Sequence, residues 1–295
     1  MTAPSAQDWL RLLVLVVLWG SAFALVKVGV SGAPPDLLVA SRVWIAAAPM
    51  WAWLRVRGHR LPPLTPRPDR LWLWFAALGF SGTVAPFLLV SVGQTRAPSA
   101  LAGVLMAMVP ILTALFAHIA VPAERLTPRR WAGFLVGFAG FAYLIGPDIF
   151  SQAAGAPLWA QALILLAAAC YALNAVMATR SPPAPPLVTA AGMVIAAAVM
   201  LTPLGLAAAL RSGPPTAASL AAIFALGIGA TAIAAIVMMQ IVRSAGPGFL
   251  SLVNYIVPIF ALALGWTLGE ALTERVFLAL PAILLGVLVV ARERR

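Results

Sequence analysis

The stretch from Leu10 to Val30 reads LRLLVLVVLWGSAFALVKVGV and decides what kind of fold this chain adopts. A helix that crosses a bilayer needs about 20 apolar residues in a row. The apolar segment of a cleavable signal peptide is shorter, at about 7 to 15 residues. This run exceeds that length and carries Trp19, Gly20 and Lys27, so it predicts a membrane helix that stays in the mature protein.

Apolar runs of similar length continue along the chain and leave no stretch for a separate soluble domain. Proline clusters such as Pro34-Pro35, Pro62-Pro63 and Pro214-Pro215 separate them, because proline disfavours a continued helix. The ten predicted helices cover residues 10–30, 36–56, 71–93, 98–120, 130–147, 157–179, 186–210, 217–242, 246–268 and 274–291.

The composition agrees with a bilayer as the solvent of this chain. Of its 295 residues, 63% are hydrophobic and 9% are charged, whereas a soluble domain carries about 25% charged residues. The net charge of +11 could point to nucleic acid, but the cations sit in short loops between apolar runs, which is typical of membrane orientation. We therefore expect a multi-pass protein of a bacterial inner membrane that does not bind nucleic acid.

The cations also predict the orientation of the helices. With a cytoplasmic N-terminus, the outer loops receive only Arg96, Arg211 and Arg275. The inner side then receives Arg11, Arg55, Arg57, Arg60, Arg67, Arg70, Arg125, Arg129, Arg130, Arg180, Arg243, Arg292, Arg294 and Arg295. Cytoplasmic loops of membrane proteins carry the excess of Lys and Arg, so both termini are predicted to lie inside.

The two halves of the chain resemble each other. Phe75–Gly79 (FAALG) is similar to Ile223–Gly227 (IFALG), and Val109-Pro110 recurs at the same offset as Val257-Pro258. The repeats are predicted to cover residues 1–150 and 151–295, with five helices each. Because five is odd, the second half enters the membrane in the opposite orientation. Inverted repeats recur in secondary transporters, where they hold substrate near the midplane and alternate access to it.

Short motifs in both halves resemble one known family. They are Trp19-Gly20-Ser21 with Lys27, Pro34-Pro35-Asp36-Leu37 with Arg42, Ala97-Pro98-Ser99-Ala100, Glu124-Arg125-Leu126-Thr127, Ser244-Ala245-Gly246, Gly269-Glu270-Ala271-Leu272-Thr273 and Gly286. Together they resemble the EamA-type, ten-helix members of the drug/metabolite transporter superfamily. One departure is Ala123-Glu124, where the family usually has Gly-Glu.

The resemblance implies export of amino acids, other metabolites or drugs, and overall likeness favours the broad-specificity aromatic amino-acid exporter type. A drug or organic-cation exporter is the alternative within transport; a membrane scaffold or intramembrane enzyme is the alternative outside it. The sequence contains no Walker loop, metal-ligand cluster or nucleophile with a base, so we expect no enzyme activity and no cofactor. A monomer and a homodimer both fit the sequence.

Two cations inside predicted helices are candidates for the substrate pathway. Lys27 is the only lysine, and it could hold a substrate carboxylate or reach the outer headgroups with its long stem. Arg42 lies at a similar depth, and a structural role at helix ends is slightly favoured for it. No carboxylate is evident at mid-membrane, so facilitated diffusion is as plausible as proton antiport.

Neutral polar and aromatic residues inside the apolar runs complete the candidate set. Tyr171 and Asn174 share a helix face by their spacing. Asn254 and Tyr255 lie in a later helix, Trp19 and Trp44 lie deeper than the other tryptophans, and His118 could relay protons or pack at an interface. Pro110 and Pro258 are candidate hinges, because proline opens the helical hydrogen-bond ladder. Interhelical hydrogen bonding is the competing role for each polar residue.

Overall fold

A computed structural model describes residues 5–63, 69–120, 127–145, 156–245, 249–250, 252–270 and 274–292. Every regular element within these residues is helical. The elements are α1 (Ala6–Gly32), α2 (Pro35–Val56), α3 (Leu71–Gly79), η1 (Phe80–Val84), α4 (Ala85–Gly93), α5 (Ser99–Met106), α6 (Val109–Ala120), α7 (Pro128–Ile145), α8 (Leu158–Ala178), α9 (Pro186–Arg211), α10 (Ala217–Phe224), η5 (Ala225–Ile233), α11 (Ala234–Ser244), α13 (Val253–Thr267) and α14 (Arg275–Arg292).

The all-helical fold class is confirmed for the described residues, and each predicted helical range contains helix. Among the residues that the structure describes, seven helices are long and apolar enough to cross a membrane by length and composition: Ala6–Gly32, Pro35–Val56, Leu71–Gly93, Ser99–Ala120, Leu158–Ala178, Pro186–Arg211 and Ala217–Ile241. Three shorter apolar helices lie at Trp131–Gly140, Ile256–Thr267 and Arg275–Gly286.

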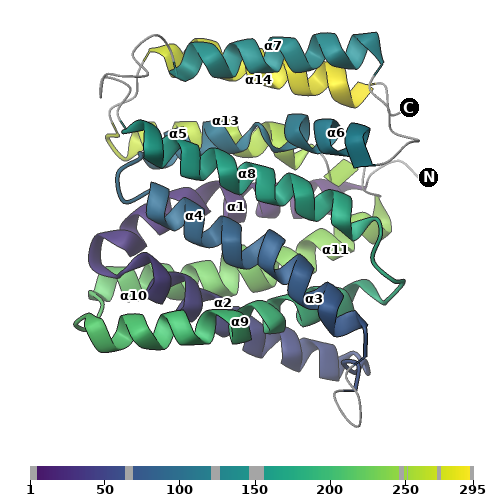
Figure 1. The fold of residues 1–295 in the computed structure, drawn as a ribbon, viewed down its shortest axis with the longest axis vertical. Helices are drawn as coiled ribbons and strands as arrows, with labels where there is room; N and C mark the ends of the chain where they lie inside the picture. Colours follow the sequence, from purple (N-terminus) through teal and green to yellow (C-terminus); the bar gives the residue numbers. More distant parts are fainter. Residues whose placement is uncertain are drawn as a thin grey trace.

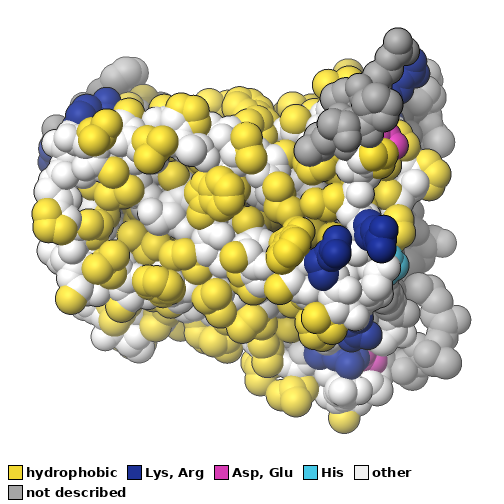
Figure 2. All heavy atoms as spheres, turned by 90° about the horizontal axis from the view of Figure 1, so that it is seen from below, with side chains coloured by type: hydrophobic (Ala, Val, Ile, Leu, Met, Phe, Trp, Pro, Cys, Tyr) yellow, Lys and Arg dark blue, Asp and Glu magenta, His cyan; other side chains and the backbone are white. Residues whose placement is uncertain are grey.

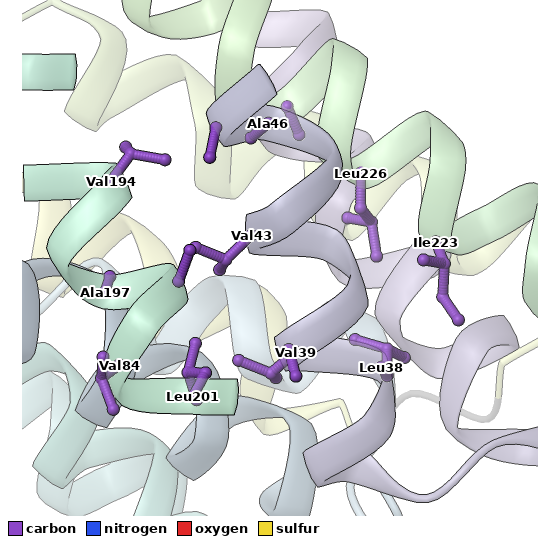
Figure 3. Packing of buried hydrophobic residues seen from close by; sticks show 14 of the residues in the cluster. Leu38, Val39, Val43, Ala46, Val84, Val194, Ala197, Leu201, Ile223 and Leu226 are labelled. Atoms are coloured by element: carbon purple, nitrogen blue, oxygen red, sulfur yellow. The ribbon is translucent and has the colours of Figure 1, made fainter. Parts of the chain in front are cut away.

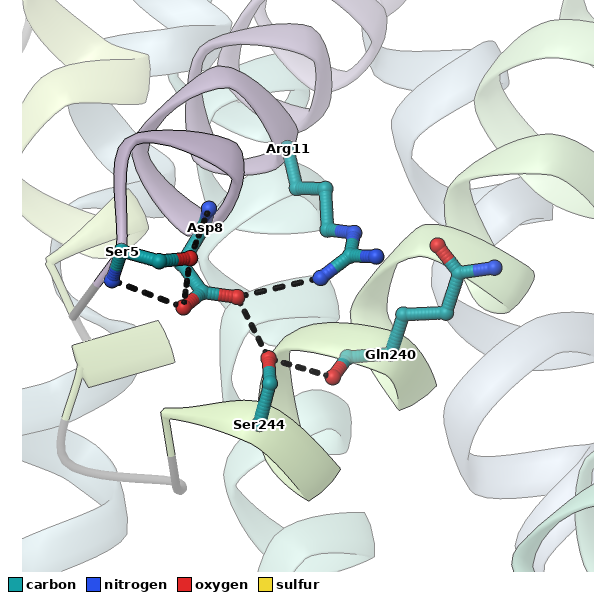
Figure 4. Close-up of polar contacts among 5 residues, drawn as sticks. All are labelled: Ser5, Asp8, Arg11, Gln240 and Ser244. Carbon is teal, nitrogen blue, oxygen red and sulfur yellow. Dashed lines mark hydrogen bonds and ion pairs between the residues drawn. The ribbon is translucent and has the colours of Figure 1, made fainter. Parts of the chain in front are cut away.

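Helix α1 begins with a capping box and is tied at that end to α11. Asp8 donates its backbone N–H to Ser5 Oγ at 3.2 Å, and its Oδ2 accepts from the Ser5 N–H at 3.0 Å. The other carboxylate oxygen of Asp8 accepts from Arg11 at 3.1 Å and from the Ser244 hydroxyl of α11 at 2.5 Å (Figure 4). One carboxylate thus satisfies free donors of a helix start and joins two helices.

Helix α2 forms the centre of the largest hydrophobic cluster. Leu38, Val39, Val43 and Ala46 of α2 lie between Val194, Ala197 and Leu201 of α9 and Ile223 and Leu226 of α10 and η5 (Figure 3). All of these side chains are buried. Burial on more than one face of α2 explains why its apolar residues are not confined to one stripe.

In the described part of the chain, two π-helical segments interrupt long helices, and no sequence pattern predicted them. η1 lies between α3 and α4, and η5 lies between α10 and α11. Phe75–Gly79 leads into η1, and Ile223–Gly227 runs into η5. π-Bulges are rare overall, but those that occur are often at functional sites. Their presence at both copies of the repeated pattern therefore makes these two helices candidates for a functional site.

The helices lie side by side, and the start of α1 and the end of α14 lie at the same end of the bundle (Figure 1). We call this the terminal end. Figure 2 shows a wide apolar surface, with most of the cations in view gathered toward that same end. This arrangement is typical of a membrane protein whose basic loops share one side.

Helices α7 and α14 pack against each other along one edge of the bundle (Figure 1). Gly133, Gly137 and Gly140 of α7 make this contact close. A Cβ at Gly286 would lie 2.5 Å from the backbone oxygen of Gly133 and 2.6 Å from the backbone nitrogen of Gly137. Small residues let helix backbones approach in membranes, and here backbone faces backbone.

We therefore expect Gly286→Ala to lower the thermal unfolding midpoint in detergent, because overpacking typically costs about 1–3 kcal/mol. Gly213→Ala is the matched control, since a Cβ there meets no atom within 4 Å. Equal midpoints for the two variants would contradict the close packing of α7 on α14.

Candidate functional site

Arg42 is the most deeply placed cation among the described helices. It is 6% exposed, and its Nε donates to Thr231 Oγ1 of η5 at 2.9 Å. The Thr231 hydroxyl itself donates to the carbonyl of Leu226 at 2.9 Å, which leaves its lone pair for Arg42. The guanidinium carbon lies 3.9 Å from the centroid of the Phe87 ring on α4.

These contacts are enough to keep a charge inside the bilayer. A charged side chain at the centre of a membrane helix costs about 2.5–3.5 kcal/mol on insertion scales. A desolvated cation–π contact returns about 2 kcal/mol, and a hydrogen bond to a charged group about 1.5–3 kcal/mol. Arg42 is therefore stable without a ligand, although its partners are a threonine side chain and an aromatic ring and not the helix ends expected from the sequence.

Arg42 nevertheless keeps binding capacity. A guanidinium carries five N–H donors, and within the described residues only Nε of Arg42 donates a hydrogen bond. Tyr171 of α8, which is half-buried, lies within electrostatic reach. The donors of Arg42 thus face a place where α2, α4, η5 and α8 meet, and an anionic group could bind there.

Lys27 binds a helix end. Its ammonium donates to the carbonyl oxygens of Gln94 at 3.0 Å and Ala97 at 3.2 Å, just beyond the last residue of α4. A cation is favourable at the C-terminus of a helix, where free carbonyls and the helix dipole are negative. This contact uses two of the three ammonium donors, and the two roles weighed from the sequence, a substrate anchor and a reach to headgroups, stay predictions.

Glu270 holds the beginning of the next helix. Its two carboxylate oxygens accept from the backbone N–H groups of Ser99 and Ala100, both at 2.9 Å, and from the Ser99 hydroxyl at 2.7 Å. An anion at a helix N-terminus is favourable for the converse reason. The α4–α5 connection is thus fixed by Lys27 on its carbonyls and by Glu270 on its amides. The parallel residue Glu124 lies outside the described residues.

Asn174 joins α8 to the first π-helical segment. Its amide donates to the carbonyl of Leu78 at 2.8 Å and to the Ser81 hydroxyl at 3.1 Å. Asn174 thus contacts the helix formed by α3, η1 and α4. For Asn174 the structure shows interhelical hydrogen bonding, one of the two roles weighed from the sequence.

Two candidates lie away from Arg42. Trp44 is 46% exposed and donates to Thr202 of α9 at 3.0 Å. It shares a face of α2 with the exposed Trp51, seven residues on. Residues 42 and 44 lie on opposite sides of a helix, so Trp44 does not share the face of Arg42, and its place in a substrate pathway stays a prediction. His118 packs edge-on against Trp131 of α7, with ring centroids 5.9 Å apart.

The remaining candidates stand in different settings. Trp19 is half-buried among the apolar residues between α1, α11 and α13, and Asn254 is exposed on α13. The side chain of Tyr255 lies outside the described residues. Pro110 is the second residue of α6, next to the break that separates α5 from α6 at residues 107–108, whereas Pro258 lies inside the unbroken α13. The structure therefore contains a break at only one of the two hinge candidates.

Gln94 and Ser91 were not among the candidate residues indicated by the sequence. Gln94 is fully buried, and its Nε2 donates to the Phe23 carbonyl of α1 at 2.8 Å. Both side chains hold a buried oxygen without a hydrogen-bond partner, Ser91 Oγ and Gln94 Oε1. Because Gln94 stands beside Thr95 and Arg96, the sequence indicates a polar loop there. The signal that could have identified Gln94 is its position at the end of an apolar run.

At the terminal end, a cleft of about 190 Å³ opens where α2 ends. It is lined by Trp53, Arg57, His59, Leu187, Ile236, Met239 and Gln240. Within the described residues, no group of three or more His, Cys, Asp or Glu side chains could hold a metal ion.

We expect Lys27→Met to lower the free energy of unfolding by roughly 1–3 kcal/mol, because the carbonyls at the end of α4 lose their charged donor. Lys27→Arg keeps the charge and should recover most of that loss. Thermal unfolding of the purified variants in detergent measures both, and an unchanged midpoint for Lys27→Met would rule out a structural role.

Comparison with known proteins gives the family. The model of the EamA-like transporter family matches the chain twice, over residues 9–146 and 158–292. The inner membrane transporter YedA of Escherichia coli K12 is 28% identical over 95% of this chain and 89% of its own length. The aromatic amino acid exporter YddG of Ancylobacter novellus is 32% identical over 74% of each chain.

Two further matches are a shorter relative and a solved structure. A probable terminal-alkyne amino-acid exporter of Streptantibioticus cattleyicolor is 29% identical over 45% of this chain and 43% of its own. A crystal structure matches with a TM-score of 0.65 and 26% identity, covering 99% of this chain and 100% of the other. With a family model matched along nearly its whole length, the chain belongs to the EamA-like transporter family.

Proposed function

We propose that this protein exports amino acids or similar small metabolites across the bacterial inner membrane by alternating access, with substrate bound beside Arg42. The observation that carries the proposal is the setting of Arg42. A buried guanidinium keeps free donors where α2, α4, η5 and α8 meet. A substrate carboxylate fits those donors, because Arg binds carboxylates through paired N–H groups.

The pairing of helices supports two inverted halves, residues 1–150 and 151–295. Helix α2 packs on α9, α7 on α14 and α5 on α13, so helices at matching places in the two halves contact each other. The contact of α4 with α8 has its counterpart in the contacts of α1 with α10 and α11. The family model also matches each half separately.

Two glycine contacts support the same symmetry at the level of single residues. A Cβ at Gly79 would meet the backbone oxygen of Met193 at 2.6 Å, and one at Gly227 would meet the side chain of Ile45 at 2.6 Å. Gly227 follows Gly79, and Met193 follows Ile45, by the interval that separates Pro258 from Pro110. The two close contacts thus exchange places between the halves, as a pseudo-two-fold axis requires.

The proposal includes ten membrane-spanning helices with both termini in the cytoplasm. The shared terminal end of α1 and α14 and the cations gathered toward it support this orientation (Figures 1 and 2). Five helices in each half return the chain to its starting side.

A fluorescent protein fused after Arg295 and expressed in bacteria should therefore fold and fluoresce, because it stays in the cytoplasm. An alkaline phosphatase fused at the same residue should stay inactive, because it needs periplasmic disulfide formation. Active phosphatase with a dark fluorescent fusion would contradict the orientation.

An organic-cation exporter is less well supported. The carboxylates within the described residues lie at helix ends or in connections, where Asp8 caps α1, Asp36 pairs with Arg211 at 3.0 Å, and Glu270 caps α5. None of these contacts leaves a carboxylate facing Arg42. A cationic substrate would meet a buried positive charge instead, which is unfavourable. A non-transport scaffold or intramembrane enzyme is disfavoured by membership of a transporter family.

Flux in liposomes tests the proposal. Arg42→Gln keeps a hydrogen-bond donor for Thr231 but removes the charge, so we expect amino-acid counterflow to fall at least ten-fold, the value of about one charged hydrogen bond. Arg211→Gln is the control, because its guanidinium is exposed and pairs with Asp36. If the wild-type protein shows no saturable counterflow of any amino acid, the substrate assignment is wrong.

A further inference from the structure

One face of α4 carries polar groups that the rest of the fold leaves unused. Phe87, Ser91 and Gln94 follow one another at intervals of four and three residues, so they lie in line on the helix surface. Phe87 lies under the guanidinium of Arg42, and Gln94 lies where Lys27 binds the helix end. This line, which we call the α4 stripe, runs about 10 Å from one cation to the other.

The α4 stripe contains both of the buried side-chain oxygens that have no hydrogen-bond partner within the described residues. They are Ser91 Oγ and Gln94 Oε1, in side chains that are 1% and 0% exposed. Turning the Gln94 amide over would not help, because its Nε2 already donates to the Phe23 carbonyl and an oxygen there would face another acceptor. A buried polar atom without a partner is unfavourable, and such atoms call for an explanation.

The two cations at the ends of the α4 stripe, by contrast, have hydrogen-bond donors that are not used. Lys27 uses two of its three N–H donors, and Arg42 uses one of five within the described residues. Spare donors at Arg42 and Lys27 thus flank spare acceptors at Ser91 and Gln94. A molecule with a carboxylate and an ammonium group a few ångströms apart matches this order, because its two ends need donors and acceptors respectively.

We propose that the α4 stripe is the half of the substrate route that leads from Arg42 to the end opposite the termini, and that Ser91 Oγ and Gln94 Oε1 accept hydrogen bonds from the substrate ammonium. The inference rests on the proposed function and narrows its substrate class to zwitterions. A simple anion would leave both oxygens unpaired, and an organic cation would have no group for Arg42 or Lys27.

Access to the stripe requires a conformational change at that end. Both oxygens are sealed from solvent in this structure, and the α4–α5 connection beyond them is held by Lys27 and Glu270. Separation of α1 from α4 would break the Gln94–Phe23 and Lys27–Gln94 hydrogen bonds together. It would also expose the two unpaired oxygens, so their burial favours opening once substrate or water can reach them.

Competition in proteoliposomes tests the inference. Labelled phenylalanine is the transported probe, and the competitors are phenylalanine itself, N-acetylphenylalanine, which lacks the ammonium, and phenethylamine, which lacks the carboxylate. For the wild-type protein, we expect phenylalanine to compete at least ten-fold more strongly than either analogue, because each analogue loses one charge-assisted contact.

Two variants test whether the α4 stripe binds substrate or only contributes to packing. In Ser91→Ala and Gln94→Leu, the preference for phenylalanine over N-acetylphenylalanine should fall toward parity, while the preference over phenethylamine persists through Arg42. Gln161→Leu is the matched control, because Gln161 is also buried in a membrane helix and donates its Nε2 to a backbone carbonyl, that of Ala156, at 2.9 Å. It should keep the wild-type ratios.

The outcomes distinguish the two proposals. Wild-type transport without discrimination, or variants with unchanged ratios, would overturn the stripe and leave the exporter standing. A wild-type protein that moves no amino acid would overturn both. If Gln94→Leu fails to fold, Ser91→Ala decides alone, since its hydroxyl makes no hydrogen bond whose loss could unfold the protein. Ser91→Ala should unfold at the wild-type temperature or above it.

Discussion

Every polar group inside a bilayer must find its partner within the protein, and this constraint shapes most of the contacts described above. Water cannot satisfy the free carbonyls and amides of helix ends at that depth. At the α4–α5 connection, Lys27 donates hydrogen bonds to the free carbonyls and Glu270 accepts hydrogen bonds from the free amides. At the terminal end, Asp8 does the same for α1 (Figure 4). Charged side chains are thus placed where backbone groups are left over.

Because of the same constraint, the polar groups that remain unpaired need an explanation. Arg42 is held by one hydrogen bond and an aromatic ring, which offset the cost of its charge but leave donors free. Ser91 and Gln94 keep acceptors that nothing nearby uses. These unpaired groups lie on the neighbouring helices α2 and α4. A transporter needs such exceptions, because substrate can be bound only by groups that the protein has not already satisfied.

Irregular helix geometry lies next to these groups. The π-helical segment η5 brings Thr231 to Arg42, and η1 precedes the part of α4 that carries Phe87. A π-turn shifts the register of the side chains that follow it, so each segment changes which residues face the interior. The glycines at Gly79 and Gly227 let these same helices approach α9 and α2 closely. Close packing and altered register thus occur together where the two halves meet.

The sequence by itself determined membrane residence, the ranges of the helices and the similarity of the two halves, because hydrophobic runs and breakers act over a few residues. It also found Arg42 and Lys27 as cations inside helices. Only the tertiary structure decided what they contact, because the partners are remote: Arg42 meets Thr231 189 positions away, and Glu270 caps Ser99 171 positions away. The π-helical segments and the unpaired oxygens of α4 could not be predicted from the sequence either, because a local pattern does not indicate which donors and acceptors lack a partner after packing.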